Sequence, residues 1–238
     1  MTYTAYPAYK ESGVEWLGQI PEAWEISTIG KTYSVQLGKM LQNDPQSPSD
    51  TFELYLRASN IKWEGVDYSD IKRMWFSSQE KKKYCLKNGD LLISEGGDAG
   101  RSCIFKEISE DSIYIQNAIN CVSSPNENST SFLYYWVFML KSIGYIDMIC
   151  NKATIMHYTA EKVKSTLLAL PSLSEQRAIA AFLDGETARI DTLIAKQQRM
   201  IELLKERRSA LITAAVTGKI DVRAAGAARE EEEAIHAG

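Results

Sequence analysis

Residues 170–219 read LPSLSEQRAIAAFLDGETARIDTLIAKQQRMIELLKERRSALITAAVTGK, and this stretch decides much of the fold. Residues 174–217 form a run of 44 without a proline. Ser172 followed by Glu175 has the spacing of a helix-capping box, and Gly218 is a typical C-terminal stop. The sequence therefore predicts a single helix about 65 Å long.

Apolar side chains recur along this predicted helix at three- and four-residue spacing, and Glu186, Gln197 and Arg207 interrupt them. Such a stripe needs another helix to cover it. The sequence offers no second comparable helix, so a second copy of the chain is the simplest partner and another chain is the alternative. The predicted length also exceeds the diameter of a domain of this size, which argues against packing back along the chain's own domain. We predict a helix–helix interface at Leu183, Ile190, Leu193, Met200, Leu204 and Leu211.

The composition is that of a folded protein, with 45% hydrophobic and 10% aromatic residues. No apolar run approaches the roughly 18 residues that cross a bilayer, and residues 1–16 lack a hydrophobic signal core. The four cysteines are widely spaced without a C-x-x-C pair, and there are two histidines. We therefore expect reduced core cysteines, no structural zinc site and a cytoplasmic location.

The remaining sequence predicts a mixed α+β domain. Residues 1–170 alternate short apolar runs with Gly, Asn, Pro and Ser. Residues 131–149 are rich in large apolar side chains and are interpreted as two buried helices that break at Gly144. The long helix then occupies residues 171–218, and the Ala- and Glu-rich residues 219–238 are expected to be a disordered tail. Strands are predicted at 53–61, 90–94, 102–105, 112–122 and 167–171.

Charge is segregated along the chain. The net charge of −4 argues at first against a nucleic-acid partner. Residues 57–106 nevertheless carry ten basic groups against seven acidic ones, a balance of +3. An ordinary solvated surface explains this balance as well as a DNA-binding face does, so charge alone does not decide between them.

Recognisable catalytic motifs are missing from the sequence. It has no G-x-x-x-x-G-K-S/T phosphate-binding loop and no N/D-P-P-Y/F motif of amino-methylating enzymes. Asp90, Glu95 and Asp98 lack the lysine that metal-dependent nucleases pair with such carboxylates. His157 and His236 cannot form a metal cluster. We therefore expect no catalytic residue and no metal site in this chain.

Three polar clusters have the chemistry of DNA recognition instead. The glycines of loop 94–102 would let backbone N–H groups and Arg101 approach a polar surface. Gln116 and Asn117 interrupt an apolar strand, and such amides read adenine edges while Arg and Lys read guanine edges. The alternative is that these amides merely satisfy a strand end. The third cluster, residues 151–165, has a charge balance of +2. The candidate DNA-contacting residues are Lys39, Ser59, Asn60, Lys62, Ser94, Gly97, Gly100, Arg101, Ser102, Gln116, Asn117, Lys152, His157 and Tyr158.

Three segments resemble the specificity subunit of type I restriction-modification systems: YKESGVEWLGQIPEAWE (9–25), GDLLISEGGDAGRSCIF (89–105) and residues 169–221. The last segment is very similar to the conserved spacer helix of that family. The resemblance implies a target recognition domain at 1–170 and a spacer helix at 171–218. Full-length members carry two of each, and their helices pair antiparallel. This chain has one of each, so a two-fold dimer would restore two recognition domains.

The resemblance also implies partners. A specificity subunit binds double-stranded DNA and two modification subunits, which carry S-adenosylmethionine and methylate adenine at N6; a restriction subunit with an ATP-driven motor can join. S-adenosylmethionine, ATP and Mg are then expected on partner subunits only, and this chain is expected to be non-catalytic. Two identical readers imply an interrupted palindromic site. The alternatives are a DNA-binding module of another defence or modification system, a coiled-coil adaptor that binds protein, and a self-sufficient methyltransferase, which the missing motif opposes.

Overall fold

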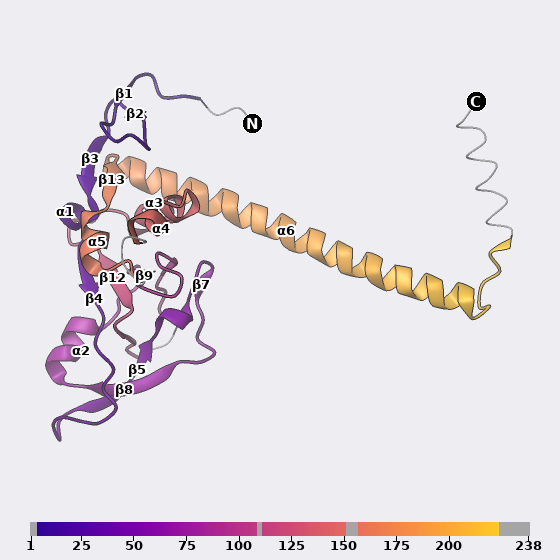
Figure 1. Cartoon of the computed structure of the whole chain (residues 1–238), viewed down its shortest axis with the longest axis horizontal. Coiled ribbons are helices and arrows are strands. Elements are labelled where there is room, and N and C mark those ends of the chain that lie inside the picture. The colour runs from indigo at the N-terminus through magenta and orange to yellow at the C-terminus, as the bar shows by residue number, and fades with distance from the viewer. Residues whose placement is uncertain (1–3, 109–110, 151–156, 224–238) are drawn as a thin grey trace. The chain divides into compact units, whose positions relative to one another are not determined.

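The computed structural model describes residues 4–108, 111–150 and 157–223 (Figure 1). The chain divides into two compact units, residues 1–182 and residues 183–238, and each is described by itself. The first unit contains all the strands of the described chain, and the described part of the second consists mainly of one long helix. Among the described residues, no helix is both long enough and apolar enough to cross a membrane.

The largest sheet of the first unit has four antiparallel strands in the order β10–β9–β12–β4. Its strand β9 directs Leu91 and Ile93 into one apolar core and Leu92 into another, and all three side chains are fully buried. Because both faces are covered, the strand reads as an unbroken apolar run rather than an alternating one. The strands are β4 (Ser34–Leu37), β9 (Leu91–Ser94), β10 (Ser102–Ile104) and β12 (Ile119–Ser123).

Smaller pairings complete the strands of this unit. β11 (Tyr114–Ile115) runs parallel to β5 (Thr51–Leu56), which pairs antiparallel with β8 (Lys72–Phe76). The antiparallel pair β13–β3 ties the segment that enters the long helix to the N-terminal part of the chain. The remaining short strands are β1 (Tyr9–Glu11), β2 (Gln19–Pro21), β3 (Glu25–Thr28), β6 (Ile61–Lys62), β7 (Gly65–Val66) and β13 (Leu167–Leu170).

Helix α3 provides much of the first core. Its residues Leu133, Val137 and Leu140 are fully buried in the same cluster as Leu91 and Ile93 of β9. This packing holds β9, and the loop that follows it, against the helical part of the unit. The helices of the unit are α1 (Ile29–Thr32), η1 (Ala58–Asn60), α2 (Ser78–Tyr84), α3 (Thr130–Ser142), α4 (Tyr145–Cys150) and α5 (Ala160–Ser165).

The predicted strands at 90–94, 102–105 and 167–171 are confirmed as β9, β10 and β13, and the predicted helix break at Gly144 is confirmed by its φ of 76°. Two predicted strands are too long. The 53–61 prediction ends as β5 at Leu56, where the chain enters η1 and then β6. The 112–122 prediction is split into β11 and β12 because the backbone turns at Ala118, whose φ is 98°.

The long helix is α6 (Leu173–Val216), 44 residues as predicted. At its start the Ser172 hydroxyl accepts the Glu175 N–H at 3.4 Å. The Glu175 carboxylate does not complete a capping box; its Oε1 accepts the Tyr6 hydroxyl at 2.7 Å and Trp24 Nε1 at 3.0 Å. The hydrogen bond to Glu175, together with partial burial, raises the pKa of Tyr6 to about 12. The first turns of α6 are therefore anchored to the N-terminal segment, and the compact unit extends to Phe182, past the predicted boundary at residue 170.

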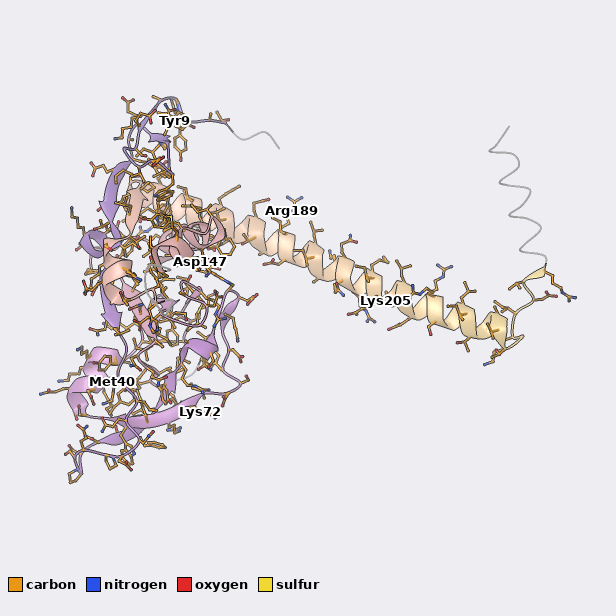
Figure 2. The ribbon with its side chains drawn as sticks, in the orientation of Figure 1. Tyr9, Met40, Lys72, Asp147, Arg189 and Lys205 are labelled. Carbon is orange, nitrogen blue, oxygen red and sulfur yellow. The ribbon has the colours of Figure 1, made fainter. Side chains whose placement is uncertain are left out.

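The other end of α6 closes with a Schellman motif at Gly218, whose φ is 71°. The Lys219 N–H donates to the Ala214 carbonyl at 2.8 Å and the Gly218 N–H donates to the Ala215 carbonyl at 3.2 Å. Figure 2 shows side chains such as Arg189 and Lys205 projecting from different sides of this part of the helix. The five predicted interface residues from Ile190 to Leu211 are 51–57% exposed, and Leu183 is half-buried.

Candidate nucleic-acid interface

The glycine-rich loop between β9 and β10 is shaped by its backbone. The Ser94 N–H donates to the Arg101 carbonyl at 2.8 Å, and the Gly100 N–H donates to the Ser94 carbonyl at 2.9 Å. Gly97 and Gly100 have φ values of 75° and 87°, which favour glycine. At Gly100 a Cβ would also lie 2.7 Å from a side-chain carbon of Ile146. These contacts fix where Arg101 leaves the loop.

Arg101 links this loop to the turn after β5. Its Nη2 donates to the Ala58 carbonyl at 3.2 Å, and its Nη1 lies 3.7 Å from Asp98 Oδ2. Lys141 joins the network 3.1 Å from Asp98 and 2.7 Å from Asp147. Burial alone would lower the pKa of Lys141, but the hydrogen bonds to the two aspartates outweigh burial and raise it. The guanidinium is thus held in place while its side chain stays 23% exposed.

Gln116 and Asn117 lie where β11 gives way to β12. The Gln116 N–H donates to the Leu56 carbonyl at 3.0 Å, and the Asn117 N–H donates to the Lys39 carbonyl at 2.6 Å. Ala118 follows with its positive φ, and its carbonyl accepts the N–H of Glu95 at 2.8 Å. Such a conformation costs about 1–3 kcal/mol in a residue with a Cβ, so the surrounding pairing must enforce it. Both amide side chains are half-buried and reach the surface.

Gly38 makes this junction possible. A Cβ at that position would lie 2.2 Å from the Gln116 carbonyl oxygen, an atom of the backbone that cannot rotate away. The close approach lets the chain at Gly38 and Lys39 pair with the β11–β12 junction, as the isolated bridge between Lys39 and Gln116 shows. Gly38 and Lys39 therefore contribute to the strand pairing through their backbone.

The turn at η1 presents Ser59. Asn60 is 3% exposed; its Oδ1 accepts the Arg57 N–H at 2.9 Å and its Nδ2 donates to the Asp67 carbonyl at 2.8 Å. Ser59 itself is exposed. Sequence reasoning missed Arg57, whose Nη2 donates to Asp70 Oδ2 at 2.6 Å beside this turn. Its membership in the basic 57–106 segment was the signal that could have singled it out.

His157 and Tyr158 differ in accessibility although they are neighbours. Tyr158 is fully buried: its N–H donates to the Glu95 carbonyl at 2.7 Å, and its hydroxyl lies 2.7 Å from the Thr166 hydroxyl. Burial raises the pKa of Tyr158 well above its usual value, so it stays neutral. His157 is half-buried, with Nδ1 3.7 Å from Glu95 Oε1. Lys152, from the same predicted cluster, lies outside the described residues.

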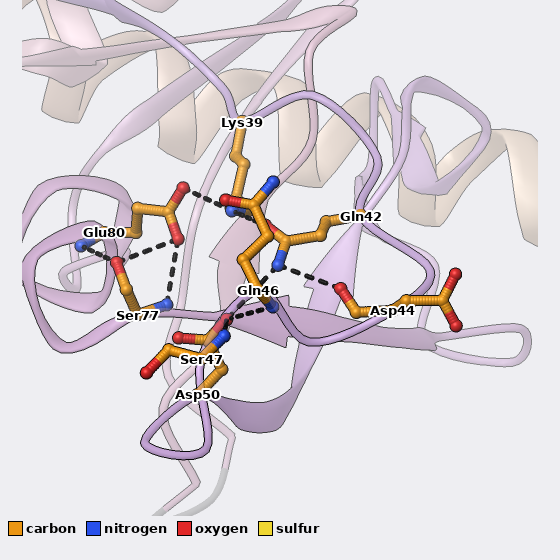
Figure 3. A network of polar contacts seen from close by, with 8 residues as sticks. All are labelled: Lys39, Gln42, Asp44, Gln46, Ser47, Asp50, Ser77 and Glu80. Carbon is orange, nitrogen blue, oxygen red and sulfur yellow. Dashed lines mark hydrogen bonds and ion pairs between the residues drawn. The ribbon is translucent and has the colours of Figure 1, made fainter.

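Lys39 has a structural role (Figure 3). It is 5% exposed, forms an ion pair with Glu80, donates to Gln42 Oε1 at 2.6 Å and lies 5.4 Å from the centre of the Phe76 ring. Gln42 in turn donates to Asp50 Oδ2 at 3.3 Å. Burial would raise the pKa of Glu80, but hydrogen bonds from Lys39 and Ser77 outweigh burial and lower it. A phosphate or base could reach Lys39 only by displacing this network.

The structure therefore divides the predicted residues into two groups. The side chains of Lys39, Asn60, Ser94, Ser102 and Tyr158 are buried, and burial corrects their assignment to direct DNA contact; Gly100 is buried as well. Backbone hydrogen bonds and the Arg101–Ala58 contact link the segments that carry the accessible residues. Lys62, in β6 directly after η1, is half-buried. We call the accessible group the polar edge: Ser59, Lys62, Gly97, Arg101, Gln116, Asn117 and His157.

The polar edge carries guanidinium, amide, ammonium, imidazole and hydroxyl side chains. Guanidinium and amide groups can each make two hydrogen bonds to one base edge, and hydroxyls can donate or accept. Across the described residues, no group of three or more His, Cys, Asp and Glu could hold a metal ion. Because its side chains offer hydrogen-bond donors and acceptors, the polar edge is suited to binding a polar surface.

Comparisons with known proteins find a matching family and several related proteins. The family described as type I restriction modification DNA specificity domain matches residues 21–203. The EcoBI type I restriction enzyme specificity subunit of Escherichia coli is 28% identical over 149 residues, which cover 61% of this chain and 30% of that relative. The MjaVIII type I specificity subunit of Methanocaldococcus jannaschii is 22% identical over 228 residues, 92% of this chain and 50% of the relative. The chain thus spans half or less of these relatives.

A solved structure shares the fold. A chain from work on complex assembly and conformational transition of the type I R-M system superposes with a TM-score of 0.63 at 18% identity. The superposition covers 87% of this chain and 48% of the other. The two chains therefore share their fold over most of the length of this chain.

Proposed function

The chain belongs to the type I restriction modification DNA specificity domain family, and we propose that it recognises a double-stranded DNA sequence for partner subunits that carry out the chemistry. The observation that carries this proposal is the polar edge. Segments far apart in the sequence are tied together there, and they present Ser59, Arg101, Gln116 and Asn117 at the surface.

Direct readout would come from the accessible side chains. Arg101 has the geometry to donate to the O6 and N7 atoms of guanine, and Gln116 or Asn117 to pair with the N6 and N7 atoms of adenine. Each such contact discriminates by about 1–3 kcal/mol. The ion pair with Asp98 holds the Arg101 guanidinium in position before DNA arrives, which reduces the entropy lost on binding. Lys62 and Arg57 are suited to phosphate contacts that set the orientation of the unit.

A dimer would present two DNA-reading surfaces instead of one. Two copies that pair through α6 would carry two polar edges, and identical readers would favour an interrupted palindrome. Modification subunits would bind S-adenosylmethionine and methylate adenine at N6 within that site. A restriction subunit would add ATP- and Mg-dependent cleavage. The chain would then determine which DNA sequence the complex acts on and would contribute no catalytic group of its own.

The experiment is sequence selection from a random duplex library, with wild-type protein and two arginine variants. Arg101→Ala should weaken binding of the selected sequence by about 5- to 150-fold and relax the preference at one position, since a base contact of about 1–3 kcal/mol is lost. Arg177→Ala is the matched control, because this exposed arginine lies on α6, away from the polar edge in the sequence. An unchanged preference in Arg101→Ala would remove Arg101 from the readout.

A further inference from the structure

The exposed face of α6 has an internal symmetry. Three lines of side chains, each with a seven-residue spacing, form this face between residues 183 and 211. Most members are large and apolar, and those from Ile190 to Leu211 are about half exposed. We call these lines the helix face: Leu183, Ile190, Gln197, Leu204 and Leu211; Glu186, Leu193, Met200 and Arg207; Thr187, Ile194, Ile201 and Arg208.

The polar members of the helix face are placed evenly about Gln197. Glu186 lies eleven residues before it, and Arg207 and Arg208 lie ten and eleven residues after it. The apolar members obey the same symmetry. Leu183 and Leu211 are each fourteen residues from Gln197, and Ile190 and Leu204 are each seven residues from it, in opposite directions.

We propose that two copies pair antiparallel along the helix face, with the two-fold axis at Gln197. This inference rests on the dimer proposed above and specifies its register. Glu186 of one copy then lies beside Arg207 of the other, twice in each dimer. Leu183 faces Leu211, Ile190 faces Leu204, and the two Gln197 side chains meet at the axis. Leu193 and Ile194 pack beside Met200 and Ile201, respectively.

Other registers place polar side chains against apolar ones. A slip of one heptad in one direction sets Gln197 against Leu204 and Arg207 against Leu193. A slip in the other direction sets Gln197 against Ile190 and Glu186 against Met200. Either slip buries charge against hydrocarbon, which is unfavourable without a partner. Polar positions within an apolar seam are the usual means by which coiled coils fix their register.

A parallel pair fails for a different reason. In register, its two-fold axis runs along the helices, so the Glu186 line of each copy lies beside the Thr187 line of the other. Glu186 then has no basic partner, and Arg207 lies beside Arg208, where like charges repel. The antiparallel pair instead places each Glu186 beside an Arg207, which gives two opposite-charge contacts. The charge pattern of the helix face therefore selects both the orientation and the register of a second copy.

The first test is cross-linking of the full chain. Neighbouring helices have axes about 8–10 Å apart, so Cα atoms that face each other at the axis come within disulfide reach. Gln197→Cys should cross-link into covalent dimers under mild oxidation, above the background of the four native cysteines. Ser209→Cys is the matched control, because this exposed position lies on the opposite side of the helix. Equal cross-linking by both variants, or none by Gln197→Cys in a dimeric protein, would overturn the register.

Charge reversal tests the orientation. Glu186→Arg alone and Arg207→Glu alone should each weaken self-association about tenfold, since two attractive contacts per dimer become repulsive. The double variant should return to near wild-type association, because the antiparallel pairs are restored with their signs exchanged. In a parallel pair Arg207→Glu alone would strengthen association, because the new carboxylate would lie beside Arg208. Stronger association of Arg207→Glu, or failure of the double variant to recover, would contradict the proposal.

The sedimentation behaviour of the wild-type chain separates the two proposals. A wild-type dimer without cross-linking at position 197 and without charge-reversal rescue would overturn the register and leave the dimer standing. A wild type that stays monomeric at all concentrations would overturn the dimer itself, and with it the register.

Discussion

The two units of this chain differ in which side chains depart from the usual distribution of buried apolar and exposed polar groups. The 1–182 unit buries polar groups such as Lys39, Asn60 and Ser94, and it surrounds them with hydrogen bonds or an ion pair. The described part of the 183–238 unit leaves large apolar side chains such as Leu193 and Leu204 exposed. A buried polar group with internal hydrogen bonds stabilises the fold itself. An exposed apolar stripe instead indicates a surface that binds a partner.

The largest effect is expected when the apolar stripe of α6 is made polar. Leu193→Glu together with Leu204→Glu should reduce self-association at least about 1000-fold, because charged groups would be buried in both copies. Ala195→Glu, at an exposed position outside the helix face, should leave association unchanged. Sedimentation equilibrium measures both, and circular dichroism checks that the helix persists. A dimer that survives the double substitution would show that the helix face is not the interface.

The buried polar network offers the next largest effect. Glu80→Gln should lower the free energy of unfolding by about 3 kcal/mol, because it leaves the Lys39 ammonium buried without its anion. Lys39→Met should cost less, since the Glu80 side chain is 32% exposed and can turn toward water. Urea denaturation of both variants gives the order. The reverse order would mean that the lysine, and not the carboxylate, is the more easily solvated partner.

A smaller effect should appear as a pH dependence of the same network. The pKa of Glu80 lies below its ordinary value of 4.5, so the stabilisation it provides is fully present above that pH and is lost as pH falls through the lowered pKa. The difference in unfolding free energy between wild type and Glu80→Gln should therefore be constant near pH 7 and narrow below about pH 4.5. A difference that stays constant down to pH 3 would contradict the pairing.

The sequence predicted the features that depend on local patterns. The bounds of α6 follow from Ser172, Gly218 and the apolar spacing, which act within a few residues of one another. The break at Gly144 and the strands around the 94–102 loop also follow from local signals. These signals were sufficient because each concerns residues that are close in the chain.

Burial at the candidate site could not be predicted in this way. Lys39 after Gly38 resembles an exposed phosphate ligand, and its partner Glu80 lies 41 residues further along the chain. Tyr158 is buried by contacts with Glu95, Asn120 and Thr166, which come from separate elements. Arg57 was overlooked because its position beside Ser59 depends on the turn at η1. Tertiary packing decided which polar side chains reach the surface.

Two identical polar edges, one from each copy of the chain, are expected to read DNA together. The most direct measurement is selection of bound sequences from a random duplex library by the purified wild-type chain, at a salt concentration near physiological. We expect enrichment of two identical half-sites in inverted orientation at one fixed spacing. Binding without any enriched sequence, or enrichment of a single half-site by a dimeric protein, would contradict it.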